Sequence, residues 1–231
     1  MFEMKGSVPR AKASRAPAPS RPGPDDTRDK LLKAAEEIFA ERGFQAATVR
    51  EICLRAGANV AAINYHFGDK LSLYTEVLKK FARTLDVEGS VAGQTMPPED
   101  LLRAIIRLRL RAVFSSDHPD WLFRVMAHEW AQPTPAMDRV LNGTMRPLYD
   151  RFRQIVGTII GRPPDDEKTR LCVHSIIGQA LHYVQGRPVL ARLWPDLTMT
   201  PQQVDRIADH IADFSLAYLQ RCTPERRRTR A

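Results

Sequence analysis

The residues with the clearest chemical meaning in this sequence of 231 residues lie on either side of Gly57. Thr48 followed by Glu51 is a capping-box pattern, which starts a short helix that stops before the glycine. Another short helix covers about residues 59–66. The tight turn Arg55-Ala56-Gly57-Ala58 joins the two, and its glycine allows a turn that most side chains would obstruct. With one helix before them, this pair is typical of a helix-turn-helix.

The last helix of such a motif can read DNA sequence, because it fits the major groove and brings side chains to the base edges. Bulky side chains at its tip would hold the backbone away from the bases. The tip here carries only small or polar side chains, at Ala58, Asn59, Ala61 and Ala62. The apolar residues of the same helix fall three or four apart and form a separate stripe: Val60, Ile63 and Phe67. This pattern predicts contact with DNA.

Catalytic and metal-binding patterns are missing from the sequence. It has no glycine-rich phosphate loop, no Gly-x-Ser-x-Gly elbow and no His-Glu-x-x-His. His128 and Glu129 are adjacent and point away from one another on a helix. His174 and His182 lie eight apart, and neither has a second ligand three or four residues away. We therefore expect no catalytic residue, metal or cofactor, and an all-helical enzyme is the alternative from another functional class.

The chain between its two ends has helical periodicity, with apolar residues three and four apart and no sustained alternation. We expect an all-α protein with an N-terminal three-helix DNA-binding domain and a helical domain after it. Gly43 should end the first helix as a left-handed cap, and Asp69 should cap the fourth. The expected helices are 26–42, 48–56, 59–66, 70–90, 99–115, 119–131, 135–160, 166–185 and 201–220.

The basic excess lies in the two ends of the chain. The formal net charge is +8, yet residues 1–24 and 221–231 each have five basic residues against one acidic residue, so residues 25–220 are formally neutral. The basic ends suit phosphate contacts and simple solubilisation equally well. The expected domains are a disordered Pro/Ala-rich tail at 1–24, the helix-turn-helix domain at 25–72, an effector-binding and dimerisation domain at 73–221, and a basic tail at 222–231.

Two further properties bear on location. No apolar run approaches the roughly 18 residues that cross a bilayer, and the N-terminus lacks the apolar stretch of a secretory signal. Cys53, Cys172 and Cys222 have no spacing typical of a redox or metal motif, so we expect reduced thiols. These features favour a cytoplasmic protein that makes no contact with a membrane.

The segment TRDKLLKAAEEIFAERGFQAATVREICLRAGANVAAINYHFGDKLSLY, residues 27–74, resembles the DNA-binding domain of the TetR/AcrR family of transcription regulators. The resemblance includes the Phe-Ala-x-x-Gly-Phe element, Thr48, the Ala-Gly turn, Tyr-His-Phe and Lys70. It implies that Thr48 contacts phosphate, that the segment from Asn59 through Val60, Ala61 and Ala62 reads bases, and that three further residues grip phosphates. Those three residues are Asn64, Tyr65 and Lys70.

The recognition segment departs from the commonest family pattern. Asn-Val-Ala stands where members often have Ser-Lys-Gly or Ser-Thr-Gly, and Ile-Asn-Tyr-His-Phe stands in place of Leu-Tyr-His-Tyr-Phe. This form resembles the CecR-type branch of the family. The segments RVMAHEWAQPTPAMDRV and LCVHSIIGQALHYVQGRPVLARLWP are similar to the effector-binding domain of that branch.

The resemblance implies a homodimer on double-stranded operator DNA, because a two-fold protein places equivalent helices one DNA turn apart, roughly 34–36 Å, on a palindrome. The family's dimer interface uses the last two long helices, here about 166–187 and 201–220. The function expected is repression relieved by a small hydrophobic or aromatic effector, and ligand-dependent activation stays open as the alternative.

The middle helices are expected to enclose this effector. They carry an aromatic and methionine-rich set, although most of its members also suit an ordinary core: Trp121, Phe123, Met126, Trp130, Met145, Tyr149 and Phe152. The residues predicted to contact the effector are Trp121, Arg124, His128, Glu129, Tyr149, His174, Gln179 and His182.

Overall fold

The computed structural model describes residues 24–87, 95–115 and 121–222, and every regular element in these ranges is a helix. The predicted all-α class is confirmed. Nearly all of the two predicted tails lies outside the described residues. The helices are α1 (Pro24–Ala46), α2 (Val49–Ala56), α3 (Val60–Phe67), α4 (Lys70–Leu85), α5 (Pro98–Phe114), α6 (Trp121–Ala131), α7 (Pro135–Val140), a π-helical turn (Leu141–Met145), α8 (Arg146–Ile160), α9 (Glu167–Gln185), α10 (Arg187–Leu193) and α11 (Pro201–Cys222).

The helices differ from the expectation at two boundaries and in one additional helix. Gly43 has φ 69° and ψ 175°, so it interrupts α1 with a positive φ but is not a left-handed cap, and one more turn follows to Ala46. α4 ends at Leu85, short of residue 90. α10 was not expected because Pro188 suggests a helix breaker. Pro188 lies in the first turn of α10, where a proline costs no helical hydrogen bond.

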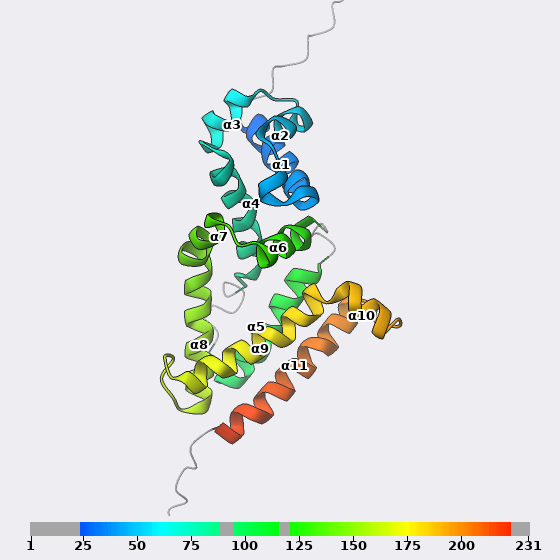
Figure 1. Cartoon of the computed structure of the whole chain (residues 1–231). Helices are drawn as coiled ribbons and strands as arrows, with labels where there is room; N and C mark the ends of the chain where they lie inside the picture. The colour runs from blue at the N-terminus through cyan, green and yellow to red at the C-terminus, as the bar shows by residue number, and fades with distance from the viewer. Residues whose placement is uncertain (1–23, 88–94, 116–120, 223–231) are drawn as a thin grey trace, which may run out of the picture.

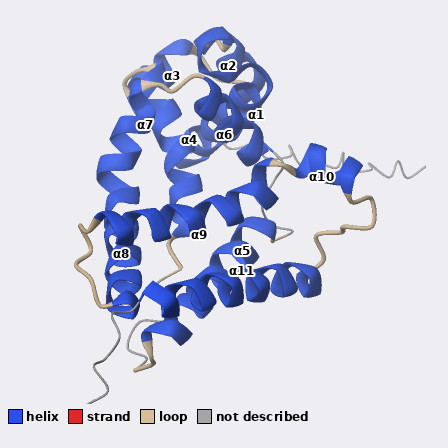
Figure 2. Ribbon diagram, turned by 60° about the horizontal axis from the view of Figure 1, so that its bottom comes forward, coloured by secondary structure: helices blue, strands red, loops and turns tan. Residues whose placement is uncertain are grey.

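The helices form two groups with α6 and α7 between them. Figure 1 shows α1, α2 and α3 gathered at one end of the molecule, and α5, α8, α9 and α11 towards the other. Figure 2 shows the same order from another side. α4 runs from the first group towards the second, and α6 packs extensively against α1 while α7 packs against α4. The helix-turn-helix is therefore held by elements that follow it in the sequence.

Two separate clusters of buried side chains match these groups. The first joins α1–α4 to α6 and α7, and it includes Tyr74 and Trp121. The second joins α5, α8, α9 and α11, and it includes Leu102 and Ile211. The domain boundary near residue 72 stays a prediction. The packing shows that the core of the N-terminal helices continues past that position.

A ladder of ion pairs joins α5 to α11. Arginines four residues apart on α5 face aspartates four residues apart on α11, in the opposite order along the chain: Arg103–Asp213, Arg107–Asp209 and Arg111–Asp205. All six side chains are partly exposed, so each pair contributes little, about 0–1 kcal/mol. The matching spacing fixes the antiparallel direction and register of the two helices.

The π-helical turn changes which side of the helix at 135–160 is buried. Before the turn, Ala136 and Val140 lie in the first cluster. After it, Phe152 and Val156 lie in the second. A π turn contains one residue more than an α turn, so it rotates the buried stripe by one position. One continuous helix thus supplies side chains to both cores.

Truncation of a side chain in the second cluster should lower stability. Leu102 is fully buried, so Leu102→Ala should lower the free energy of unfolding by about 2–5 kcal/mol. Leu54 is 82% exposed, and Leu54→Ala should change it by no more than about 0.5 kcal/mol. Urea unfolding followed by circular dichroism measures both values. Equal effects of the two substitutions would contradict the core position of Leu102.

Candidate DNA-binding and ligand-binding sites

The first turns of α2 and α3 are fixed by side-chain caps. The Thr48 hydroxyl oxygen accepts from the Glu51 N–H at 3.2 Å, and the Glu51 carboxylate accepts from the Thr48 N–H at 3.1 Å, as the capping-box pattern predicts. The Thr48 hydroxyl donates to the same carboxylate and, with nearby Arg42, holds the Glu51 pKa below its usual value. Asn59 caps α3 by accepting from the Ala62 N–H at 2.9 Å. Both helices therefore begin at defined residues.

The turn between α2 and α3 needs glycine for its backbone conformation. Gly57 has φ 65° and ψ 31°, the left-handed region that residues with a Cβ avoid. A Cβ added there would meet nothing within 4 Å. Most side chains would therefore obstruct this turn, as expected, through the strain of a Cβ at positive φ and not through contact with a neighbouring residue.

The predicted base-reading residues lie on an exposed helix at one end of the molecule (Figure 1). Tyr65 is 81% exposed, Ala61 and Asn64 are also exposed, and Ala62 is half-buried. Of the predicted apolar stripe, Ile63 is fully buried and Phe67 is partly buried against the first cluster. Val60 is 49% exposed and therefore does not belong to the buried side of the helix. The accessible side of α3 is therefore small and polar apart from Val60 and the Tyr65 ring.

Two of the predicted phosphate contacts are engaged within the protein. Both donors of Thr48 bond to Glu51. The Lys70 amine lies 4.5 Å from the centre of the Phe44 ring and 3.5 Å from the Gln45 carbonyl oxygen, and burial lowers the Lys70 pKa. Thr48 and Lys70 must exchange these contacts to reach phosphate, whereas Tyr65 is already exposed. The roles of all these residues in DNA binding stay predictions.

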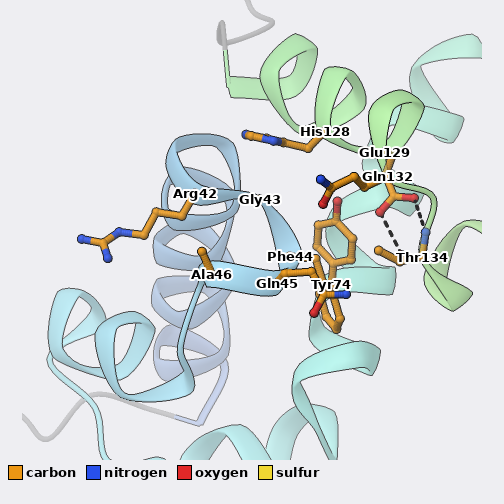
Figure 3. Close-up of a pocket in the computed structure, with 10 residues that line it drawn as sticks. All are labelled: Arg42, Gly43, Phe44, Gln45, Ala46, Tyr74, His128, Glu129, Gln132 and Thr134. Carbon is orange, nitrogen blue, oxygen red and sulfur yellow. Dashed lines mark hydrogen bonds between the residues drawn. The ribbon is translucent and has the colours of Figure 1, made fainter.

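A cavity of about 160 Å³ lies where α1 meets α4 and α6; we call it the junction cavity (Figure 3). Among the predicted effector contacts, it includes His128 and Glu129. The Glu129 side chain is 2% exposed, and its carboxylate accepts from the Thr134 N–H at 3.1 Å and the Thr134 hydroxyl at 2.8 Å. The lining residues are Arg42, Gly43, Phe44, Gln45, Ala46, Tyr74, His128, Glu129, Gln132 and Thr134.

α6 approaches α1 closely at Gly43. A Cβ at this glycine would lie 3.1 Å from Nδ1 of His128, and Nε2 of His128 lies 3.3 Å from the Ala40 carbonyl oxygen. Trp121, at the start of α6, is buried in the first cluster, and Arg124 is exposed. Neither residue lines the junction cavity. His128 thus links the end of the first helix to α6.

The remaining predicted effector contacts lie elsewhere. The Tyr149 hydroxyl is 3.1 Å from His174 Nε2, between α8 and α9. The Gln179 amide donates to the Ser215 hydroxyl at 3.3 Å, between α9 and α11. His182 is exposed near the end of α9. The eight residues therefore do not line one cavity together.

The junction cavity also contains residues that the sequence did not single out as functional. Tyr74 falls on the apolar stripe of α4 and has the pattern of a core residue. Gln132 and Thr134 lie in a connection between helices. Only the packing of α6 on α1 brings these residues together, and periodicity carries no information on that packing.

Other kinds of site find no support in the described ranges. These residues include no group of three or more His, Cys, Asp or Glu side chains placed to hold a metal ion. Within the same ranges, no helix combines the length and apolar character needed to span a bilayer. All three cysteines are free thiols.

Both halves of the chain match models of known protein families. Residues 31–77 match the model of bacterial regulatory proteins of the tetR family. Residues 98–219, more than half of the chain, match the model of the C-terminal domain of the HTH-type transcriptional dual regulator CecR. The chain belongs to the TetR family, in its CecR-type branch. It is a DNA-binding transcriptional regulator.

Individual relatives agree with this family. The HTH-type transcriptional dual regulator CecR of Shigella flexneri is 26% identical to this regulator over 177 residues, which are 72% of this chain and 79% of the relative. The HTH-type transcriptional activator FasR of Mycolicibacterium smegmatis is 43% identical over 61 residues, 26% of this chain and 28% of the relative. The second match is therefore confined to a short part of each protein.

Solved structures share the fold. FadR from Bacillus subtilis, in complex with stearoyl-CoA, has a TM-score of 0.58 and 17% identity, and the match covers 82% of this regulator and 97% of FadR. A transcriptional regulator from Pseudomonas aeruginosa PAO1 has a TM-score of 0.61 and 22% identity, with 88% and 97% covered. At these identities the likeness establishes the arrangement of helices.

Loss of the capping box should weaken the helix-turn-helix. Thr48→Ala removes the acceptor for the Glu51 N–H, and it should lower the free energy of unfolding by about 0.5–2 kcal/mol. Thr48→Ser keeps the hydroxyl and should retain most of the stability. Thermal and urea unfolding of the purified regulator measure both. A Thr48→Ala variant as stable as the unchanged protein would show that the cap contributes nothing.

Proposed function

We propose that this regulator is a homodimeric repressor that binds a palindromic operator through α2 and α3 and leaves it when a small hydrophobic or aromatic effector binds. The observation that carries the proposal is the accessible side of α3. Its small residues allow close approach to base edges, and the caps at Thr48 and Asn59 fix the starts of α2 and α3. We assign base reading to Asn59, Val60, Ala61 and Ala62, and phosphate contact to Thr48, Asn64, Tyr65 and Lys70.

The proposed dimer forms through α9 and α11. Both helices expose large apolar side chains, with Leu171 57%, Phe214 63% and Tyr218 48% accessible to solvent. Exposed apolar side chains of this size on adjacent helices favour burial against a second copy of the chain. Two-fold symmetry then presents two copies of α3 to the two halves of a palindrome.

The proposed response to effector runs through α4 and α6. These helices share a buried cluster with α1–α3, so a ligand that moves them changes the position of α3. Relatives support a ligand-responsive regulator, since FadR was solved with stearoyl-CoA; NicS and BepR are named repressors, FasR an activator and CecR a dual regulator. A difference of about 2–3 kcal/mol between the affinities of the effector for the two states changes operator binding about 30- to 150-fold.

Binding to DNA from upstream of its own coding sequence tests the proposal. Fluorescence anisotropy, with random DNA as competitor, should give a Kd of about 10⁻⁸ M or tighter. Ala61→Glu should abolish binding without loss of fold, because residue 61 is exposed and a carboxylate there would face the phosphates and base edges. Ala191→Glu, exposed on α10, is the matched control and should bind normally. If both variants bind alike, α3 is not the reading helix. A reporter gene then distinguishes repression from ligand-dependent activation.

Disruption of the proposed interface should yield monomers. Phe214→Glu places a charge in the apolar surface of α11, and sedimentation should then give the mass of a single chain. Gln154→Glu, exposed on α8, should leave the dimer intact. A dimeric Phe214→Glu variant would place the interface elsewhere.

A further inference from the structure

A buried hydroxyl in the junction cavity has no partner. The Tyr74 side chain is fully buried, and its hydroxyl approaches the Glu129 carboxylate but has no partner within normal hydrogen-bond geometry. Figure 3 shows this hydroxyl directed towards Gln132 and Glu129. Buried polar groups are almost always hydrogen-bonded, because water is no longer available to them. The open position beside Tyr74 is therefore suited to a molecule that supplies the missing bond.

The carboxylate next to this hydroxyl has no counter-ion. Glu129 is held by the N–H and hydroxyl of Thr134, and no basic side chain in the described ranges forms an ion pair with it. Each carboxylate oxygen has a further lone pair that can accept. A buried charge is normally paired, because its removal from water is costly. Burial, the charge of the adjacent Glu129 carboxylate and the approach of the hydroxyl to that carboxylate raise the Tyr74 pKa, which keeps the hydroxyl protonated and facing Glu129.

The basic groups at the edge of the cavity are committed elsewhere. The Arg42 guanidinium pairs with Glu51 at 2.7 Å, and Figure 3 shows it extended away from the cavity. His128 Nε2 faces the Ala40 carbonyl oxygen, which can only accept, so the Nε2 hydrogen donates to it. The groups available to a ligand therefore include the Glu129 carboxylate oxygens, which accept, and the Gln45 and Gln132 amides, which can donate or accept.

Aromatic rings form part of the wall. The rings of Phe44 and Tyr74 have centroids 5.0 Å apart, and both residues line the cavity. Its volume of about 160 Å³ is similar to that of a protein cavity of about 150 Å³ that admits benzene. Aromatic faces attract cations, and the Phe44 ring already has the Lys70 amine 4.5 Å from its centre. The size of the cavity and the Glu129 carboxylate therefore favour a small, flat or compact cation.

We propose that the junction cavity is a binding site for a small organic cation, whose ammonium, amidinium or guanidinium N–H groups donate to the Glu129 carboxylate and the Tyr74 hydroxyl. This site is separate from the site of the hydrophobic effector in the proposed function, because its ligand is charged and its walls include α1 of the DNA-binding half. Its occupancy does not depend on the identity of the operator.

Benzamidine is the probe, and benzamide is its neutral control of nearly the same shape. Both are added at millimolar concentration to the purified full-length regulator without DNA, and thermal unfolding and saturation-transfer NMR are measured. Benzamidine at about five times its Kd should raise the Tm by about 2–4 °C, and benzamide should not. Equal shifts from both, or no shift and no NMR signal from benzamidine, would overturn the proposal.

Substitutions locate the bound cation. Glu129→Gln removes the charge while keeping an acceptor for Thr134, and it should weaken benzamidine binding about tenfold or more. Tyr74→Phe removes the unpartnered hydroxyl, so it should leave the free protein at least as stable while it weakens binding. Asp138→Asn, exposed on α7, is the control for charge and should bind as the unchanged protein does.

Unchanged binding in both cavity variants, or an equal loss in the control, would place benzamidine elsewhere and refute the site. If Glu129→Gln does not fold, Tyr74→Phe decides alone. Every measurement is made without DNA. A failure of benzamidine binding therefore does not bear on the proposed operator binding, and a failure of operator binding does not bear on this site.

Discussion

The packing of α6 against α1 is the constraint on which the arrangement of this regulator depends. The three N-terminal helices do not close a core by themselves, because their buried face is completed by α4, α6 and α7. The buried Trp121 belongs to the same cluster as Leu31 and Ile63. Recognition of DNA and the rest of the molecule are therefore joined by continuous side-chain packing, which is the physical basis for communication between them.

Local signals explain why much of the helix-turn-helix could be predicted. The caps at Thr48, Asn59 and Asp69 are hydrogen bonds over three residues, so their donors and acceptors are visible in the sequence. Positive φ at Gly57 is a property of a single residue. The exposure of Val60 depends on neighbouring helices, and the apolar spacing of α3 alone could not reveal it.

The ligand-binding half was harder to predict for the same reason. Aromatic and polar residues at helical spacing mark a face of a helix, but they do not say which other helix that face meets. Tyr149 and His174 meet between α8 and α9, whereas Glu129 bonds to Thr134, five residues further along the chain, in a cavity shared with α1. The junction cavity is produced by a contact between segments far apart in the chain, the end of α1 and α6. No local pattern encodes such a contact.

The π-helical turn at Leu141–Met145 bears on how related chains can differ in length. It is the place where a single extra residue is stored in an otherwise regular helix. Removal of one residue there would leave a normal α-helix but turn Phe152 and Val156 about 100° away from their cluster, since each helical residue accounts for that angle. The number of residues between Val140 and Arg146 thus determines which side of the helix faces each of the two cores. Insertions and deletions should be tolerated in the connections between helices and rejected along this one.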